Sequence, residues 1–179
     1  QQLLAPVSVE LKSLKDFDLQ SAAETATTFV ENALIKCRAA AAATRLPAIA
    51  DDSGLVVPAL KGEPGVYSAR YAGEHADDAD NNRKLLAQMA QCDDRRAFFL
   101  CCMTFMQSAT DPTPIIAFGH WRGEILSQPR GAKGFGYDPL FYVSEQNATA
   151  AELLPDVKNQ LSHRGKACRT LLSRLQDYT

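Results

Sequence analysis

The sequence predicts an α/β fold built around one β-sheet. Two observations carry this prediction. Segments with helical periodicity alternate along the chain with short apolar segments, and no internal repeat or low-complexity linker interrupts that order. Because 179 residues is a common size for one domain, we expect a single domain over residues 1–179.

The first half of the chain is expected to contain two strands and two helices. Residues 7–14 alternate apolar and polar positions, as a half-buried strand does. A helix is predicted from Thr27 to Thr44, with one apolar face formed by Val30, Leu34, Cys37 and Ala41. A short strand at 48–51 then leads into a turn at 51–54, and a second helix with acidic residues at its start is predicted over 77–91.

The second half is expected to contain two long strands and a final helix. The strands are predicted at 96–107 and 114–121, joined by a connection that contains Asp111-Pro112. The helix is predicted over 162–177, where the apolar residues with helical spacing are Cys168, Leu171, Leu172 and Leu175.

Composition excludes several classes of protein. A net charge of -2 and a pI near 5.9 provide no general attraction to nucleic acid or to an anionic membrane. No apolar run approaches the roughly 20 residues of a membrane span. The five cysteines are odd in number and lack Cys-x-x-Cys spacing, which argues against zinc and against a disulfide framework. We therefore expect a cytoplasmic protein with no nucleic-acid and no membrane partner.

Two adjacent carboxylates, Asp51 and Asp52, follow an apolar segment and precede Ser53-Gly54. Successive side chains of a strand point to opposite faces, so the two acids are expected to differ in role. One would face a ligand, because magnesium is commonly held by only one or two protein carboxylates together with water and substrate phosphates. The alternative is an Asx-type turn in which a carboxylate caps backbone amides.

Glu24 and Lys36 are further candidates near the first helix. Glu24 lies close to the helix start, where a carboxylate is favoured by the helix dipole. Lys36 lies mid-helix, and its ordinary environment there is the solvated face. A functional Lys36 would have to point toward residues 51–54.

The segment 131–141 is rich in glycine, which lets backbone amides approach an anion or a base edge. Phe135 and Tyr137 alternate with glycines, so a common aromatic face could stack on a planar base. The alternative is a turn whose aromatic residues belong to the core.

Basic residues gather where the last helix is expected to begin. Lys158, His163, Arg164 and Lys166 surround Ser162, which is a suitable N-cap. Cations are normally preferred at the other end of a helix, so an anionic ligand would explain them.

Five ordered motifs together resemble the inosine/xanthosine triphosphate pyrophosphatases. They are Phe-x-Glu-Asn-Ala-x-x-Lys at 29–36, Ala-Asp-Asp-Ser-Gly at 50–54, Pro-Gly-x-Tyr-Ser-Ala-Arg-Tyr at 64–71, Gly-Phe-Gly-Tyr-Asp-Pro at 134–139 and Ser-His-Arg-Gly at 162–165. The resemblance runs from about residue 20 to the end of the chain. It implies two lobes around a long central mixed β-sheet with flanking helices, with the nucleotide in the cleft between the lobes.

The resemblance also implies an activity and a set of site residues. The activity is Mg²⁺-dependent hydrolysis of ITP, dITP or XTP to the monophosphate and pyrophosphate, by a homodimer. Asp52 would be the general base and a metal ligand, Glu24 would help to hold Mg²⁺, and Lys36 would neutralise phosphate charge. The expected nucleotide contacts are Ser53, Phe135, Gly136, Tyr137, Asp138, Lys158, His163 and Arg164. Donors from Arg164, His163 or backbone amides would pair with the oxygen that replaces the adenine amine.

One part of the family pattern does not occur in this sequence. The family opens with a strand and a Ser/Thr-x-Asn-x-x-Lys loop that holds the triphosphate, whereas this chain begins 1-QQLLAPVSV-9. Residues 1–4 resemble the end of a helix whose beginning is missing, and we expect the natural chain to extend ~20 residues further at its N-terminus.

Two other functions remain open at this point. One is a related pyrophosphatase with a preference for a pyrimidine or another modified base. The other is a purine nucleotide-binding protein without turnover, which the missing phosphate loop would favour. An RNA-binding module is disfavoured by the acidic pI.

Overall fold

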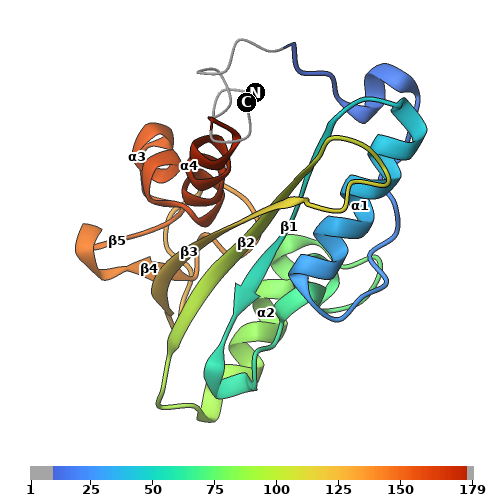
Figure 1. The fold of residues 1–179 in the computed structure, drawn as a ribbon. Coiled ribbons are helices and arrows are strands. Elements are labelled where there is room, and N and C mark those ends of the chain that lie inside the picture. Colours follow the sequence, from blue (N-terminus) through green and yellow to red (C-terminus); the bar gives the residue numbers. More distant parts are fainter. Residues whose placement is uncertain (1–9, 177–179) are drawn as a thin grey trace. The chain divides into compact units, whose positions relative to one another are not determined.

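The computed structural model describes residues 10–176 and contains a five-stranded sheet in the order β1-β2-β3-β4-β5. The strands are β1 (Ala48–Val56), β2 (Arg96–Met106), β3 (Ile115–Ile125), β4 (Phe141–Val143) and β5 (Ala148–Thr149). The α-helices are α1 (Phe29–Thr44), α2 (Asp78–Gln88), α3 (Pro155–Leu161) and α4 (His163–Gln176) (Figure 1). None of the helices in these described residues combines the length and apolar character that a membrane crossing requires.

The predicted α/β class with flanking helices is confirmed. Within the described residues the sheet is antiparallel, where the resemblance implies a mixed one. Glu124 of β3 lies opposite Tyr142 of β4, which in turn lies opposite Thr149 of β5. Short connections suffice for antiparallel neighbours, and β2 reaches β3 through residues 107–114 alone.

The chain divides into two compact units, and the three long strands contribute residues to both. The first unit contains the described residues up to Asp52, Cys101–Gly119 and the described residues from His163. The second contains Ser53–Leu100 and His120–Ser162.

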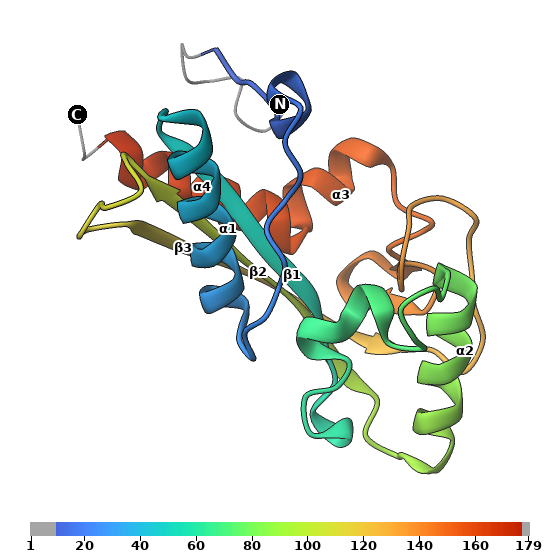
Figure 2. The ribbon, with the colours of Figure 1, turned by 90° about the vertical axis from the view of Figure 1, so that its right-hand side faces the viewer.

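In the first unit, α1 and α4 lie on opposite faces of the sheet (Figures 1 and 2). α1 packs through Cys37 and Ala41 against Ala48 and Met106. α4 packs through Leu171 against the β3 residues Ile115 and Ala117. This arrangement gives each face of β1 a different helix as its neighbour.

The second unit has an apolar core with an aromatic centre. Phe141 lies 4.7 Å from Phe99 and 5.2 Å from Trp121, measured between ring centroids. α2 begins at Asp77, whose side chain accepts a hydrogen bond from Asp80 N, and it buries Leu85. The predicted helix at 77–91 is thus confirmed, with its last turn, Met89–Gln91, in 3-10 form.

Two local predictions are wrong. Residues 10–14 of the predicted strand 7–14 form no strand, while residues 7–9, like 1–4, lie outside the described residues. Ser13 and Asp16 form a capping box that begins a 3-10 helix at Leu14–Phe17. The turn expected at 51–54 is also absent, because β1 continues through these residues to Val56.

Candidate active site

Three charged side chains meet beside α1. The Lys36 ammonium donates to Glu24 Oε1 at 2.7 Å and to Asp52 Oδ1 at 3.1 Å. The Asp52 residue is only 5% exposed and the Lys36 side chain only 13%. A solvated face for Lys36 is therefore excluded, and the orientation that a functional Lys36 needs is the one observed.

Asn32 completes this cluster, and the sequence reasoning did not select it. Its amide Nδ2 donates to Asp52 Oδ2 at 3.1 Å, and its Oδ1 accepts from Ala26 N at 2.9 Å. Asn32 and Lys36 are four positions apart on α1 and so share one face of the helix. That spacing was the available signal, although the complete burial of Asn32 could not be read from it.

Buried polar contacts hold α1 at the strands that carry the acids. Thr104 Oγ1 of β2 donates to Ala33 O of α1 at 3.1 Å and to Ala50 O of β1 at 3.3 Å. Cys37 Sγ donates to Ala48 O at 3.1 Å. These contacts fix the helix face that presents Asn32 and Lys36 to Asp52.

The cluster changes the proton affinity of its members. Burial raises the pKa of Asp52, and the charge of Lys36 and the hydrogen bond from Asn32 oppose this rise only in part. Burial alone would lower the pKa of Lys36, but its contacts with Glu24 and Asp52 outweigh burial and raise it. Lys36 therefore stays charged, and Asp52 is a more basic carboxylate than an exposed aspartate.

Asp51 makes entirely different contacts, as strand alternation predicts. Its Oδ2 accepts from Arg164 Nε at 3.1 Å and from Cys101 Sγ at 3.8 Å. The neighbouring Cys102 is buried, and its pKa is raised to about 11 by burial and by the charges of Asp52 and Asp51. Both adjacent cysteines are free thiols that lie buried in the core.

Close packing of α4 against β3 fixes the position of the first turn of α4. A Cβ at Gly119 of β3 would lie 2.0 Å from His163 O and 2.5 Å from Ala167 N. Only glycine permits this approach, and the approach brings Arg164 to Asp51. The helix predicted to start near Ser162 is confirmed, with His163 as its first residue.

In the second unit, the loop at 134–138 is organised around a buried carboxylate. Asp138 Oδ2 accepts from Phe135 N at 2.9 Å and forms an ion pair with Lys158. The Lys158 ammonium also lies 4.6 Å from the centroid of the Phe135 ring, and Phe135 is 63% exposed. The Asp138 side chain is 96% covered. Through these contacts Asp138 fixes the positions of Lys158 and of the loop.

The prediction that Phe135 and Tyr137 form a common aromatic face is wrong. Tyr137 is 3% exposed within the core, and its hydroxyl donates to Ser68 O at 2.8 Å. Gly134 and Gly136 have positive φ, so side chains along this loop do not follow the two-residue alternation of a strand. Phe135 alone presents an exposed ring.

Gly136 is held by two α2 side chains that the sequence reasoning also missed. Its N donates to Asp78 Oδ2 at 2.6 Å, and its O accepts from Asn82 Nδ2 at 2.9 Å.

Ser53, another predicted contact, lies in β1 directly after Asp52.

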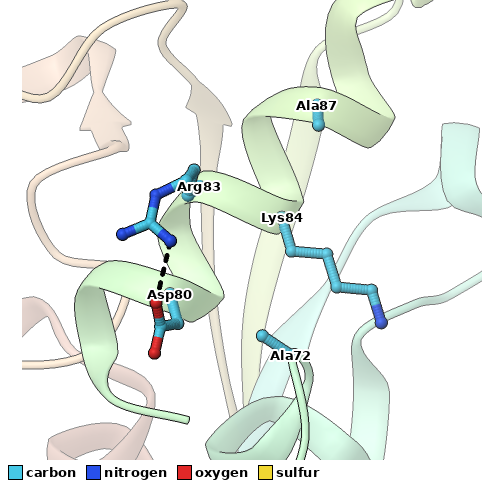
Figure 3. A pocket seen from close by; sticks show the side chains of 5 residues that line it. All are labelled: Ala72, Asp80, Arg83, Lys84 and Ala87. Atoms are coloured by element: carbon cyan, nitrogen blue, oxygen red, sulfur yellow. Dashed lines mark hydrogen bonds and ion pairs between the residues drawn. The ribbon is translucent and has the colours of Figure 1, made fainter.

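A shallow pocket on α2 lies apart from the predicted residues of this unit. It is lined by Ala72, Asp80, Arg83, Lys84 and Ala87, and Arg83 is paired with Asp80 at 2.8 Å (Figure 3). Lys84 also lines it, and its ammonium donates to Tyr71 O. The pocket therefore offers little free polar chemistry to a ligand.

Comparison with known proteins identifies close relatives. The dITP/XTP pyrophosphatase of Vibrio cholerae is 52% identical over 177 residues, which cover 98% of this chain and 88% of that protein. The dITP/XTP pyrophosphatase of Aromatoleum aromaticum is 56% identical over 173 residues, covering 97% of this chain and 87% of that protein.

Solved structures agree with the sequence relatives. A HAM1 protein from Coxiella burnetii superposes with a TM-score of 0.94 at 47% identity, covering 99% of this chain and 91% of that one. A dITP/XTP pyrophosphatase from Mycobacterium abscessus has a TM-score of 0.79 at 42% identity, with coverages of 97% and 91%. A sequence model of the Ham1 family matches residues 1–174. The chain belongs to the Ham1 family.

Proposed function

We propose that this chain is an enzyme that hydrolyses non-canonical purine nucleoside triphosphates, dITP and XTP among them, to the monophosphate and pyrophosphate. The names of its relatives support the reaction and the substrates. The single structural observation that carries the proposal is the buried Asp52 carboxylate, which Lys36 and Asn32 contact from α1.

Asp52 is suited to act as the general base. Water adds to a phosphorus atom of the anhydride between the α and β phosphates, and Asp52 accepts the proton that this water loses. Its raised pKa brings its proton affinity closer to neutral pH, which improves base catalysis. Pyrophosphate then leaves as the anhydride bond breaks.

Lys36 is suited to neutralise phosphate charge. Charge develops on phosphate oxygens during transfer, and a preorganised cation stabilises it. Lys36 already lies against two carboxylates and has only 13% of its side chain exposed, so its charge is weakly screened by solvent.

The carboxylates of Glu24 and Asp52 fit a divalent cation, which we propose to be Mg²⁺. Both contact the same ammonium group, so they lie near one another. Two protein carboxylates are enough for such an ion, because Mg²⁺ commonly takes one or two carboxylates together with water and substrate phosphates. When bound, Mg²⁺ supplies positive charge to the phosphate oxygens.

The remaining predicted residues would bind the nucleotide. Arg164 and His163 would donate to the base oxygen, and the exposed Phe135 ring offers a stacking surface. Ser53, Gly136 and Lys158 would contribute further contacts. Tyr137 and Asp138 would act indirectly, by fixing the loop.

Pyrophosphate release tests the proposal. Purified protein is assayed with ITP, dITP, XTP, ATP, GTP and CTP, with Mg²⁺ and with EDTA. We expect kcat/KM for ITP, dITP and XTP to exceed that for ATP by about 100-fold or more, and activity to require the metal. Nucleotide binding without release would indicate a binding protein, and preference for CTP would indicate a related pyrophosphatase.

We also propose a cytoplasmic homodimer. The free state of all five cysteines suits a reducing compartment. The exposed apolar side chains Ile49 and Phe118 supply surface for association. Light scattering coupled to size-exclusion chromatography is expected to give twice the chain mass, and a monomer mass would refute the dimer.

A further inference from the structure

Asn32 joins two segments that carry the proposed acids. Its side-chain oxygen accepts from the backbone N of Ala26, two residues after Glu24, at 2.9 Å. Its side-chain nitrogen donates to Asp52 Oδ2 at 3.1 Å. Asn32 itself is completely buried, so both contacts form away from solvent.

Lys36 forms a second bridge between the same two places. Its ammonium contacts Glu24 directly at 2.7 Å and the other oxygen of Asp52 at 3.1 Å. The two bridges differ in charge. Lys36 is a cation on a flexible stem, whereas Asn32 is neutral and fixed at both ends of its amide.

The difference matters once a phosphate is bound. Under the proposed function, the Lys36 ammonium also interacts with phosphate, which weakens its electrostatic attraction to Glu24 and Asp52. Two nearby carboxylates repel each other when their shared cation is engaged elsewhere. The neutral Asn32 amide is not attracted to phosphate by charge. Its hydrogen bonds to Ala26 N and Asp52 Oδ2 therefore remain in place.

We propose that Asn32 is a positioning residue that keeps Asp52 and the Glu24 segment in a metal-binding arrangement when Lys36 is engaged by phosphate. The proposal rests on the proposed function, and it assigns Asn32 no contact with the substrate. Groups that orient metal ligands in this way commonly change metal affinity by about 10–100-fold when they are removed.

Thr104 provides a matched control. It is also completely buried and also ties α1 to the strands, through Ala33 O and Ala50 O. It contacts neither Glu24 nor Asp52 through any of these bonds. Thr104→Val therefore removes a buried hydrogen bond of the same unit without touching the proposed bridge.

The test measures Mn²⁺ binding by calorimetry, without nucleotide, for Asn32→Ala, Asn32→Leu and Thr104→Val. Asn32→Leu keeps the side-chain volume, so it remains informative if the alanine variant does not fold. We expect both Asn32 variants to bind Mn²⁺ at least about 10-fold more weakly, while Thr104→Val stays within about 2-fold. Steady-state kinetics with ITP should show a lower kcat with KM changed less than about 3-fold, since Lys36 still meets the phosphate.

The same comparison in a Lys36→Met background sharpens the test. With the charged bridge removed, only Asn32 of these two bridges is left, so Asn32→Leu should weaken Mn²⁺ binding by a larger factor than it does beside Lys36. An equal factor in both backgrounds, an Asn32 effect no larger than that of Thr104→Val, or no Mn²⁺ binding by the unaltered chain would each overturn the inference. Absence of ITP hydrolysis by the unaltered chain, with the Mn²⁺ effect intact, would instead refute the proposed function.

Discussion

Arg164 contacts a single oxygen of Asp51 with two of its nitrogens, Nε at 3.1 Å and Nη2 at 3.0 Å. Asp51 and Asp52 are consecutive on β1, and their side chains meet different helices, α4 and α1 respectively. The strand therefore connects the arginine proposed to read the base with the carboxylate proposed to activate water. Its two-residue alternation produces this division.

Arg164→Ala is expected to weaken the discrimination of ITP over ATP. Removing a donor that pairs with the base oxygen reduces binding of ITP but not of ATP. We expect the ratio of the two kcat/KM values to fall about 10-fold or more, and Asp51→Asn to lower it in the same direction by less. Arg169→Ala, an exposed change on the same helix, serves as the control. Equal losses for both substrates would show that Arg164 binds phosphate instead.

Asp52→Asn is expected to abolish turnover while the protein remains folded. The amide cannot accept the proton from water, so kcat should fall by more than 10-fold. Because the folded state raises the pKa of Asp52, the stability contribution of this group is complete below its unfolded pKa and is lost as pH rises through the folded pKa. At neutral pH the variant therefore loses little folding stability, and we expect Tm to change by less than about 4 °C. Retention of more than a tenth of the activity would exclude Asp52 as the base.

Lys36→Met is expected to destabilise the protein in a pH-dependent way. The raised pKa of Lys36 means that its contribution is complete below the ordinary lysine pKa and is lost only as pH rises through the folded value. Between pH 5 and 8 the lysine is charged, so the pH dependence comes from the two carboxylates that it leaves behind. The carboxylate charge left without its cation is greatest at the highest pH, and we expect a loss of about 3 kcal/mol at pH 8.

At pH 5 the loss in Lys36→Met should be smaller, because Asp52 without its cation takes up a proton more readily. Urea unfolding at pH 5, 6.5 and 8 measures the difference from the unaltered chain. Lys12→Met is the control, since Lys12 is 48% exposed and pairs only at the surface with Glu10. A loss that is the same at every pH would argue against charge repulsion between Glu24 and Asp52.

The helices α1, α2 and α4 and the strands β2 and β3 were predictable because their patterns are local. Periodicity placed the first helix and the strands at 96–107 and 114–121, and alternation alone separated the roles of Asp51 and Asp52. The continuation of β1 through Asp52-Ser53-Gly54 was not predictable, since local turn propensity pointed the other way. Distant partners decide it: Lys36, Asn32 and Arg164 neutralise or bond the acids, so the strand can keep them.

The roles assigned to the site residues came from the family resemblance rather than from spacing. Spacing could show that Asn32 and Lys36 share a helix face, but not which of them a carboxylate would meet. The prediction for the glycine-rich loop was wrong for a related reason. The positive φ of Gly134 and Gly136 reverses the chain locally, which sends Tyr137 to the core and leaves Phe135 exposed.

Gly134→Ala is expected to raise the KM for ITP through Asp138. A Cβ at Gly134, where φ is +83°, would lie 2.1 Å from Asp138 Oδ2 and displace the carboxylate that holds Lys158 and Phe135 N. Gly62→Ala is the matched control, because φ there is +96° but no atom lies within 4 Å of the added Cβ. Both variants should lose about 1–2 kcal/mol of stability from backbone strain.

Only Gly134→Ala should also alter substrate binding, and we expect its KM to rise about 5-fold or more with kcat less affected, since Asp52 is untouched. Steady-state kinetics with ITP and urea unfolding of both variants separate strain from the loop effect. If the KM of Gly62→Ala rose as much as that of Gly134→Ala, the change would follow from backbone strain. The contact between Asp138 and Lys158 would then have no role in holding the nucleotide.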